Sequence, residues 1–257
     1  MTLCKSDCNL AYTEYGRPDG FPILVQHGLI ASIKDGGLFE RLTSAGARVI
    51  CIARPGYGES SPYVLSNIGE WGILVSELVN ALEISRFDVL GMSSGAPYSY
   101  SIAWALPETA RNIYIFSGIP AMYDDGVLAH WPFEVKKDTD LLEMKKLAHG
   151  LFFSNLAAED LARNDTRDSM ANEGFGIALD FRLRCMDWGF KIPEVNQQVI
   201  MRHARFDLGV PLVTAELTSA MLPNAALHVE ESDIHFSKES LDAFFEAEII
   251  PRMRVEK

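Results

Sequence analysis

Apolar positions in this chain alternate between short continuous runs and longer stretches with helical spacing. From residue 21 onwards, compact runs such as "FPILVQHG", "ARVICIAR", "RFDVLGM" and "RNIYIFSG" are separated by amphipathic stretches. Short apolar runs bounded by turn residues are typical of buried strands, and strands that alternate with helices form parallel sheets. The pattern therefore predicts an α/β protein built on a mainly parallel sheet.

The helical stretches have identifiable beginnings and ends. A helix is predicted from about Ile68 to Leu82, with Asn67 and Glu70 as its cap, because six apolar residues share one face: Trp71, Leu74, Val75, Leu78, Val79 and Leu82. A second helix is predicted to begin just after Ser93 and to end before Pro107. Both helices follow apolar runs, as the alternating pattern requires.

The pattern changes in the middle of the chain. From about Pro120 to Pro193 the segments are polar-rich and helical in spacing, without regular strand patterns. The strand and helix rhythm then resumes, with helices near Thr214–Leu222 and from about Lys238 to Ile250. We therefore predict a core domain formed by residues 1–119 and 194–257, and a helical cap inserted as residues 120–193.

Composition narrows the class of protein and its partners. The 257 residues are 48% hydrophobic and 23% charged, which is ordinary for a globular protein, and the formal net charge of -12 argues against a nucleic-acid partner. No run has the length of a signal peptide or a membrane span, so we expect a cytoplasmic protein without membrane attachment. A small-molecule substrate is the expected partner, and the sequence does not define the oligomeric state.

The four cysteines do not form a recognisable metal motif. Cys4 and Cys8 are close together, but no second cysteine or histidine pair follows at zinc-finger spacing, and Cys51 and Cys185 stand alone. We expect reduced thiols and no metal site.

The candidate chemistry centres on "DVLGMSSGAPY", where an apolar run ends in small residues. Gly91 and Gly95 flank Ser93 in the pattern G-x-S-x-G, and a strand that turns abruptly into a helix needs small residues on both sides of the apex. Ser93 is therefore the predicted nucleophile. The backbone N–H of Ser94, at the start of the helix, is predicted to stabilise an oxyanion.

A serine nucleophile needs a base, and the base needs an acid. Of the six histidines, His235 is the strongest candidate because it lies between the last predicted strand and the last helix. Asp207 follows another strand at the same edge of the sheet and is the preferred acid, while Asp124 and Asp125 remain alternatives. The chain order Ser93, Asp207, His235 is the order expected of this architecture.

These residues resemble the α/β-hydrolase superfamily, as serine hydrolases with a Ser-Asp-His triad, over nearly the whole chain outside the insertion. "LVQHGLIAS" is similar to the His-Gly oxyanion loop, "ARPGYGESSP" to the R-x-G-x-G-x-S loop, and "LPNAALHVEESDIHFS" to the histidine loop. The resemblance implies a mainly parallel eight-stranded sheet flanked by helices, with a helical cap. It also implies that the N–H of Leu29 is the second oxyanion donor and that His27 is structural.

The serine at the elbow indicates acyl transfer. Dehalogenases and epoxide hydrolases of this fold use aspartate there, so we expect hydrolysis of an ester-like carbonyl through an acyl-enzyme on Ser93, without a cofactor. The substrate is expected to be small and largely apolar, with three cap aromatics as candidates for its pocket: Trp131, Phe152 and Phe153.

Two other classes of function remain open. A ligand-binding or signalling protein on the same fold would hydrolyse weakly, although it would not need an intact triad. A C–C bond hydrolase or lyase would use the same three residues on a different substrate.

Overall fold

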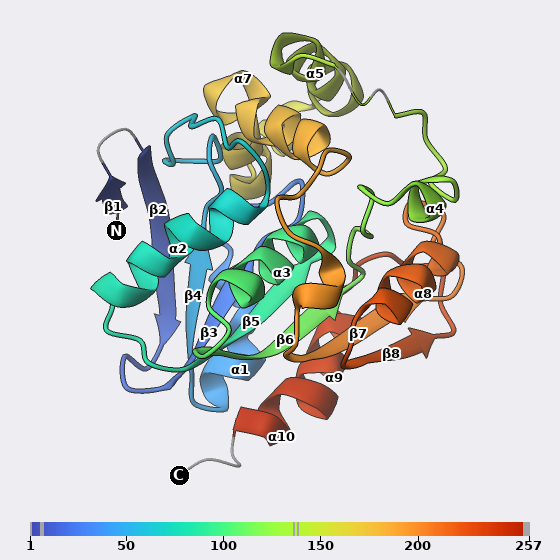
Figure 1. The fold of residues 1–257 in the computed structure, drawn as a ribbon. Coiled ribbons are helices and arrows are strands. Elements are labelled where there is room, and N and C mark those ends of the chain that lie inside the picture. Colours follow the sequence, from blue (N-terminus) through green and yellow to red (C-terminus); the bar gives the residue numbers. More distant parts are fainter. Residues whose placement is uncertain (1, 6–7, 136, 138, 254–257) are drawn as a thin grey trace.

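The computed structural model describes residues 2–5, 8–135, 137 and 139–253, and these form one eight-stranded sheet with helices on both faces (Figure 1). The order of the strands across the sheet is β1-β2-β4-β3-β5-β6-β7-β8. Their bounds are β1 Thr2–Lys5, β2 Cys8–Gly16, β3 Phe21–Gln26, β4 Ala47–Ile52, β5 Phe87–Met92, β6 Ala110–Phe116, β7 Gln198–Ala204 and β8 Ala225–Glu230.

Six of the strands run parallel. β3 pairs in parallel with β4 and β5, and the parallel pairing continues through β6, β7 and β8. β1 and β2 form an antiparallel edge, since β2 is antiparallel to both β1 and β4. The carboxyl ends of the parallel strands therefore meet along one edge, where ligands of open α/β sheets bind.

The helices connect the strands and form the segment above the sheet edge. Between the strands of the first half lie η1 Gly36–Phe39, α1 Glu40–Ser44, α2 Gly69–Ala81, η2 Ser93–Gly95 and α3 Ala96–Ala105. Between β6 and β7 lie α4 Asp125–Leu128, α5 Leu141–Ala148, η3 His149–Phe153, α6 Ala158–Ala162, α7 Asn164–Leu183 and η4 Ile192–Glu194. The last elements are α8 Leu212–Met221, α9 Lys238–Phe244, η5 Phe245–Ile249 and α10 Ile250–Met253.

The sheet is covered on both faces because neighbouring residues of each strand point to opposite sides. On β3, Leu24 belongs to the cluster under α2 and α3, whereas Ile23 and Val25 belong to the cluster under α1, α9 and η5. All three side chains are at most 1% exposed. Continuous apolar runs such as "PILV" are the sequence signature of strands buried on both faces.

The closing helix is less regular than its sequence pattern predicts. The predicted helix over residues 238–250 is observed as α9, a π-helical segment η5 and α10. Pro251, within α10, has no amide N–H and its ring conflicts with the carbonyl four residues earlier in a regular helix. The wider turn immediately before this proline removes that conflict.

The segment between β6 and β7 is helical, and no strand occurs among its described residues. Figure 1 shows α5 and α7 above the sheet, beside the ends of the central strands. The predicted fold class is confirmed, whereas the domain boundaries at residues 120 and 193 remain a prediction. Among the described helices, none combines the length and the apolar character that a bilayer span requires.

Candidate active site

Ser93 occupies a strained turn at the end of β5. Its φ angle is 49°, in the left-handed region that side chains other than glycine rarely adopt. A Cβ on Gly95 would lie 2.1 Å from the carbonyl oxygen of Gln26, and one on Gly91 would lie 2.3 Å from Oγ of Ser99. Both glycines of the G-x-S-x-G pattern are therefore required by the close packing of β3, β5 and α3.

The structure brings the three predicted triad residues together. Nε2 of His235 lies 2.9 Å from Oγ of Ser93, and Nδ1 of His235 lies 2.5 Å from Oδ2 of Asp207. A carboxylate only accepts hydrogen bonds, so Nδ1–H of His235 donates to Asp207. In the neutral ring, Nε2 is then free to accept the Ser93 hydroxyl proton, which is the arrangement that general-base catalysis requires.

Asp207 is buried and firmly held. Its second oxygen, Oδ1, accepts hydrogen bonds from the amides of Gly209 and Val210, both at 2.9 Å. Burial by itself raises the pKa of Asp207, but the hydrogen bonds from His235 and the Val210 amide outweigh it and hold the pKa below its usual value. Asp207 therefore remains an anion that orients His235.

The alternative acids are engaged elsewhere. Asp124 caps α4 by accepting hydrogen bonds from the amides of Gly126 and Val127. Asp125 pairs with Lys137 at 2.5 Å on the surface. Of these three aspartates, Asp207 is the one that contacts His235 in the structure, which favours it as the acid.

The loop after β3 lies against the elbow. A Cβ on Gly28 would lie 3.8 Å from Cβ of Ser93, and Leu29 and Ser93 line the same cavity. His27 is 4% exposed, and its Nδ1–H donates to the Gly28 carbonyl at 2.8 Å. Burial, with the Arg54 charge, holds the pKa of His27 well below its usual value, so this ring is neutral.

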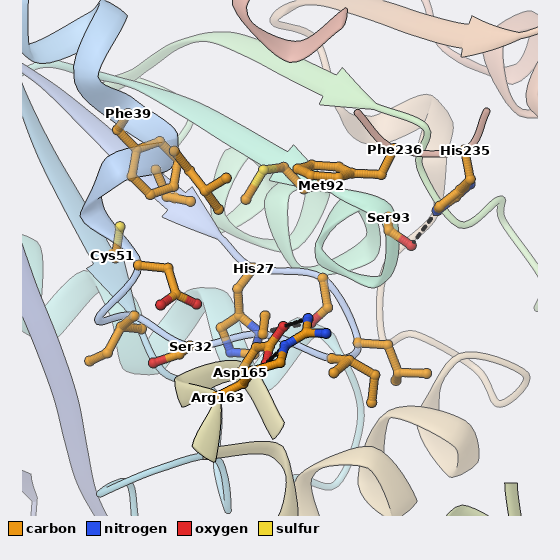
Figure 2. Close-up of a pocket in the computed structure, with 18 of the residues that line it drawn as sticks. His27, Ser32, Phe39, Cys51, Met92, Ser93, Arg163, Asp165, His235 and Phe236 are labelled. Atoms are coloured by element: carbon orange, nitrogen blue, oxygen red, sulfur yellow. Dashed lines mark hydrogen bonds and ion pairs between the residues drawn. The ribbon is translucent and has the colours of Figure 1, made fainter. Parts of the chain in front are cut away.

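A cavity of about 630 Å³ opens beside Ser93. Figure 2 shows Ser93 and His235 at one end, Phe39 and Cys51 at the other, and Met92 with Phe236 between them. Most of its lining is apolar: Val25, Leu29, Ile30, Ala31, Ile33, Leu38, Phe39, Met92, Phe152 and Phe236. Ser93 therefore faces a cavity whose lining suits a small apolar group.

The three predicted pocket aromatics occupy different places. Phe152 lines the cavity. Phe153 is instead buried in the same apolar cluster as Ile23 and Val25, where it lies against Gly174. Trp131 packs with Phe133 and under the Arg184 guanidinium in a separate cluster. Phe152 and Phe153 diverge because adjacent residues of a helical turn face different sides.

Sequence patterns did not reveal a buried polar cluster behind the His27–Leu29 loop. Arg54 and Asp180 form an ion pair at 2.7 Å, with side chains 1% and 5% exposed. The hydroxyls of Tyr57 and Tyr98 donate to the same carboxylate at 2.8 and 2.6 Å. The sequence does carry one sign of this cluster: Asp180 is a lone aspartate within the apolar face of "GIALDFRL", and a buried carboxylate needs a partner.

No group of three or more histidine, cysteine, aspartate or glutamate side chains that could hold a metal ion occurs in the described parts of the chain. The side chains of Cys8, Cys51 and Cys185 are buried.

The comparisons with known proteins agree with this architecture. No protein-family model matches the chain. It is 25% identical over 211 residues to a 2-hydroxy-6-oxononadienedioate/2-hydroxy-6-oxononatrienedioate hydrolase of Cupriavidus pinatubonensis, covering 74% of this chain and 70% of that protein.

Solved structures resemble the whole chain. A structure from a study of carboxylesterases of Nitrososphaera gargenis superposes with a TM-score of 0.72 at 17% identity, covering 98% of this chain and 99% of the other. The enol-lactonase of Burkholderia xenovorans LB400 has a TM-score of 0.70 at 15% identity, with both chains covered completely.

The elbow, the strand order and these neighbours together define the α/β-hydrolase fold. The comparisons support a hydrolase: the sequence relative is named as a dienedioate hydrolase, and the structural neighbours come from a study of carboxylesterases and from an enol-lactonase.

Proposed function

We propose that the protein is a carboxylic-ester hydrolase that acts through an acyl-enzyme on Ser93. The observation that carries this proposal is the continuous hydrogen-bonded chain from Asp207 through His235 to Ser93, which ends in the apolar cavity. His235 takes the Ser93 proton as the oxygen attacks the ester carbonyl, and Asp207 stabilises the resulting imidazolium. His235 then gives the proton to the departing alcohol.

The second half of the reaction repeats these steps with water. Water, deprotonated by His235, attacks the acyl-enzyme, and the acid is released as the proton returns to Ser93. In both halves the N–H groups of Leu29 and Ser94 stabilise the oxyanion, a role supported by the position of Gly28 beside Ser93 and of Ser94 at the start of η2. Loss of one such donor typically lowers kcat by about 100- to 1,000-fold.

The cavity favours a neutral substrate. Arg163 is the one guanidinium among the described residues of the lining, and it already pairs with Asp165, with Nε 3.1 Å from Oδ1. Asp35 adds a carboxylate that accepts a hydrogen bond from the Asn164 amide. A substrate without negative charge therefore fits the lining better than an anion.

C–C bond hydrolysis is the second candidate, and the curated relatives support it. The Cupriavidus protein is named as a hydrolase of dienedioates, which are dicarboxylates. A dicarboxylate placed in this cavity would face Asp35 and Asp165 with Arg163 already engaged. We therefore favour a neutral ester or lactone over a dicarboxylate diketone.

A substrate panel tests the proposal. Wild-type protein and Ser93→Ala are assayed on neutral esters of increasing acyl length, lactones, amides and a vinylogous dicarboxylate diketone. We expect kcat/KM to be highest for short neutral esters or lactones and to fall by at least about 10,000-fold in Ser93→Ala, as loss of a triad nucleophile does elsewhere. Turnover of the diketone alone would replace the ester proposal with C–C hydrolysis. Binding without turnover in any assay would favour the ligand-binding alternative.

A further inference from the structure

The buried Arg54–Asp180 pair lies directly behind the loop that carries Leu29. Arg54 donates from Nη1 to the His27 carbonyl at 2.5 Å and from Nη2 to the Gly28 carbonyl at 3.0 Å. The same guanidinium holds Asp180 of α7 through Nε and Nη2. One side chain therefore joins the loop after β3 to a helix above the sheet.

The Gly28 carbonyl is held by two donors. Besides Arg54, Nδ1–H of His27 donates to it at 2.8 Å. The amide of Arg54 in turn donates to Nε2 of His27 at 3.2 Å, which fixes the neutral ring in the tautomer with a proton on Nδ1. The orientation of this carbonyl is thus determined by interactions that involve no substrate.

A fixed carbonyl also fixes the neighbouring amide. The Gly28 C=O and the Leu29 N–H belong to one planar trans peptide unit, in which the two groups point in opposite directions. Arg54 and His27 hold the oxygen side of this unit, so its N–H side points away from them. Gly28 lies against Ser93, where the tetrahedral oxyanion would form.

We infer that Arg54 and Asp180 are positioning residues for the oxyanion hole, and that α7 is thereby required for its alignment. The inference rests on the proposed acyl transfer at Ser93. A guanidinium suits this role because its planar fork serves two carbonyls and a carboxylate together, which an ammonium does not. Burial opposes the charge of Arg54, but Asp180 outweighs it and raises the pKa of the guanidinium, so the fork stays charged.

A second contact between the same two elements supports this assignment. The amide of Ala31 donates to Oγ of Ser169 at 3.0 Å, and Oγ of Ser32 donates to Asp168 at 2.5 Å. Non-helical residues 171–174 separate these contacts from Asp180. Both halves of α7 are therefore attached to the segment that follows β3.

The first test replaces Arg54 by lysine. Arg54→Lys keeps the charge beside Asp180 and loses the fork that reaches both carbonyls. We expect kcat for a neutral p-nitrophenyl ester to fall about 10- to 100-fold, because a misaligned oxyanion donor acts on the transition state, while KM changes less than about 3-fold. The rate of Ser93 labelling by a fluorophosphonate should fall in parallel.

The second test separates alignment from stability. In the double variant Arg54→Met/Asp180→Leu, apolar side chains replace the whole pair, so no unpaired charge is left buried. The buried hydroxyls of Tyr57 and Tyr98 lose their acceptor, so we expect a lower melting temperature in a protein that still unfolds cooperatively. At temperatures where this variant is fully folded, we expect kcat to be reduced about 10-fold or more.

Arg111→Lys is the matched control. Arg111 makes a two-pronged contact with buried Asp88, both bonds at 2.9 Å, on strands β5 and β6 and away from the His27–Leu29 loop. We expect Arg111→Lys to have a lower melting temperature and an unchanged kcat.

Two outcomes would contradict these expectations. If Arg54→Lys and the double variant fold and their kcat stays within about 3-fold of wild type, the positioning role is overturned and the proposed function stands. A folded wild-type protein that neither turns over the ester nor reacts with the fluorophosphonate would overturn both.

Discussion

At the scale of single residues, the site depends on local backbone geometry as much as on its reactive side chains. Ser93 has a φ angle of 49°, and the backbone at Gly95 approaches the Gln26 carbonyl so closely that a side chain does not fit. A strained backbone conformation of this kind persists only where the packing around it holds it in place, which is common at active sites. The strain therefore places the Ser93 hydroxyl at the rim of the sheet.

Gly95→Ala should destabilise the protein because its Cβ would lie 2.1 Å from a backbone oxygen that belongs to a central strand. We expect the free energy of unfolding in urea to fall by about 1–3 kcal/mol, the usual cost of overpacking. Gly37→Ala is the control, since nothing lies within 4 Å of a Cβ there. Equal stability of the two variants would show that the elbow is not tightly packed.

The contacts among Ser93, His235 and Asp207 were predictable from the sequence, and the Arg54–Asp180 pair was not. Ser93 lies in a short motif. Asp207 and His235 each follow a strand that is recognisable in the sequence as an apolar run, so their order in the chain predicts that they lie at the same edge of the sheet. Asp180 is 126 residues from Arg54, and their meeting depends on how α7 packs on the loops. Periodicity carries no information about such a tertiary contact.

At the scale of elements, α2 ends in a recognisable C-terminal motif with an unusual residue. The amide of Ile84 donates to the Val79 carbonyl at 3.0 Å, and the amide of Glu83 donates to the Asn80 carbonyl at 3.1 Å. This is the Schellman pattern, in which the residue at the position of Glu83 is usually glycine. Glu83 has a φ angle of 54° instead.

Glu83→Gly should therefore stabilise the protein. Glycine adopts this conformation without the steric cost that Glu83 carries, and we expect the free energy of unfolding to rise by about 0.5–1 kcal/mol. Thermal and urea unfolding would measure the change, with kcat as a control that should not move. A drop in stability would mean that Glu83 makes a compensating contact.

The segment above the sheet offers a matched pair of adjacent aromatics. Phe152 lines the cavity, whereas Phe153 is buried against Gly174. Phe152→Ala should shift the preferred acyl length of ester substrates and change the melting temperature little. Phe153→Ala should cost about 3–5 kcal/mol of stability, as buried phenylalanine truncations do, and leave the preference unchanged. Identical substrate profiles for both variants would contradict the assignment of Phe152 to the pocket.

Some of the strands and helices could be predicted from the sequence, and others could not. Strands and the helices α2 and α3 followed from apolar runs and proline positions, because both faces of the sheet are buried. The π-helical turn at residues 245–249 and the kink within α7 did not, since each depends on a local conflict that a 3.6-residue period does not show. Trp131 illustrates the same limit, because an aromatic residue in an inserted helical segment has no periodic mark that distinguishes a pocket from a small core.

At the scale of the whole molecule, buried neutral histidines should make stability depend on pH. Burial, and to a lesser extent the charge of Arg54, holds the pKa of His27 well below its usual value. Burial also lowers the pKa of His203. The unfolded chain binds protons on both rings below about pH 6.5, whereas the folded protein binds them only at lower pH. Acid therefore favours unfolding.

We expect the free energy of unfolding to fall as the pH drops below about 6.5, by up to about 1.4 kcal/mol per pH unit for each histidine. Asp207, whose pKa is lowered in the folded state, adds a further loss only below about pH 4. His203→Gln keeps a donor for the Val210 carbonyl. We expect this variant to show a weaker dependence of the free energy of unfolding on pH between about pH 5 and 6.5, the range just below the pKa of a free histidine. An unchanged slope would exclude His203 from this effect.

In the proposed reaction, Ser93 is activated by His235 and Asp207 and attacks the substrate. The most direct measurement is reaction of the folded protein with a fluorophosphonate, followed by peptide mapping of the modified residue by mass spectrometry. We expect one phosphonyl group on Ser93, rapid labelling in the wild type, and none in Ser93→Ala or in unfolded protein. Labelling on Ser94, or a folded wild-type protein that does not react, would contradict the proposed reaction.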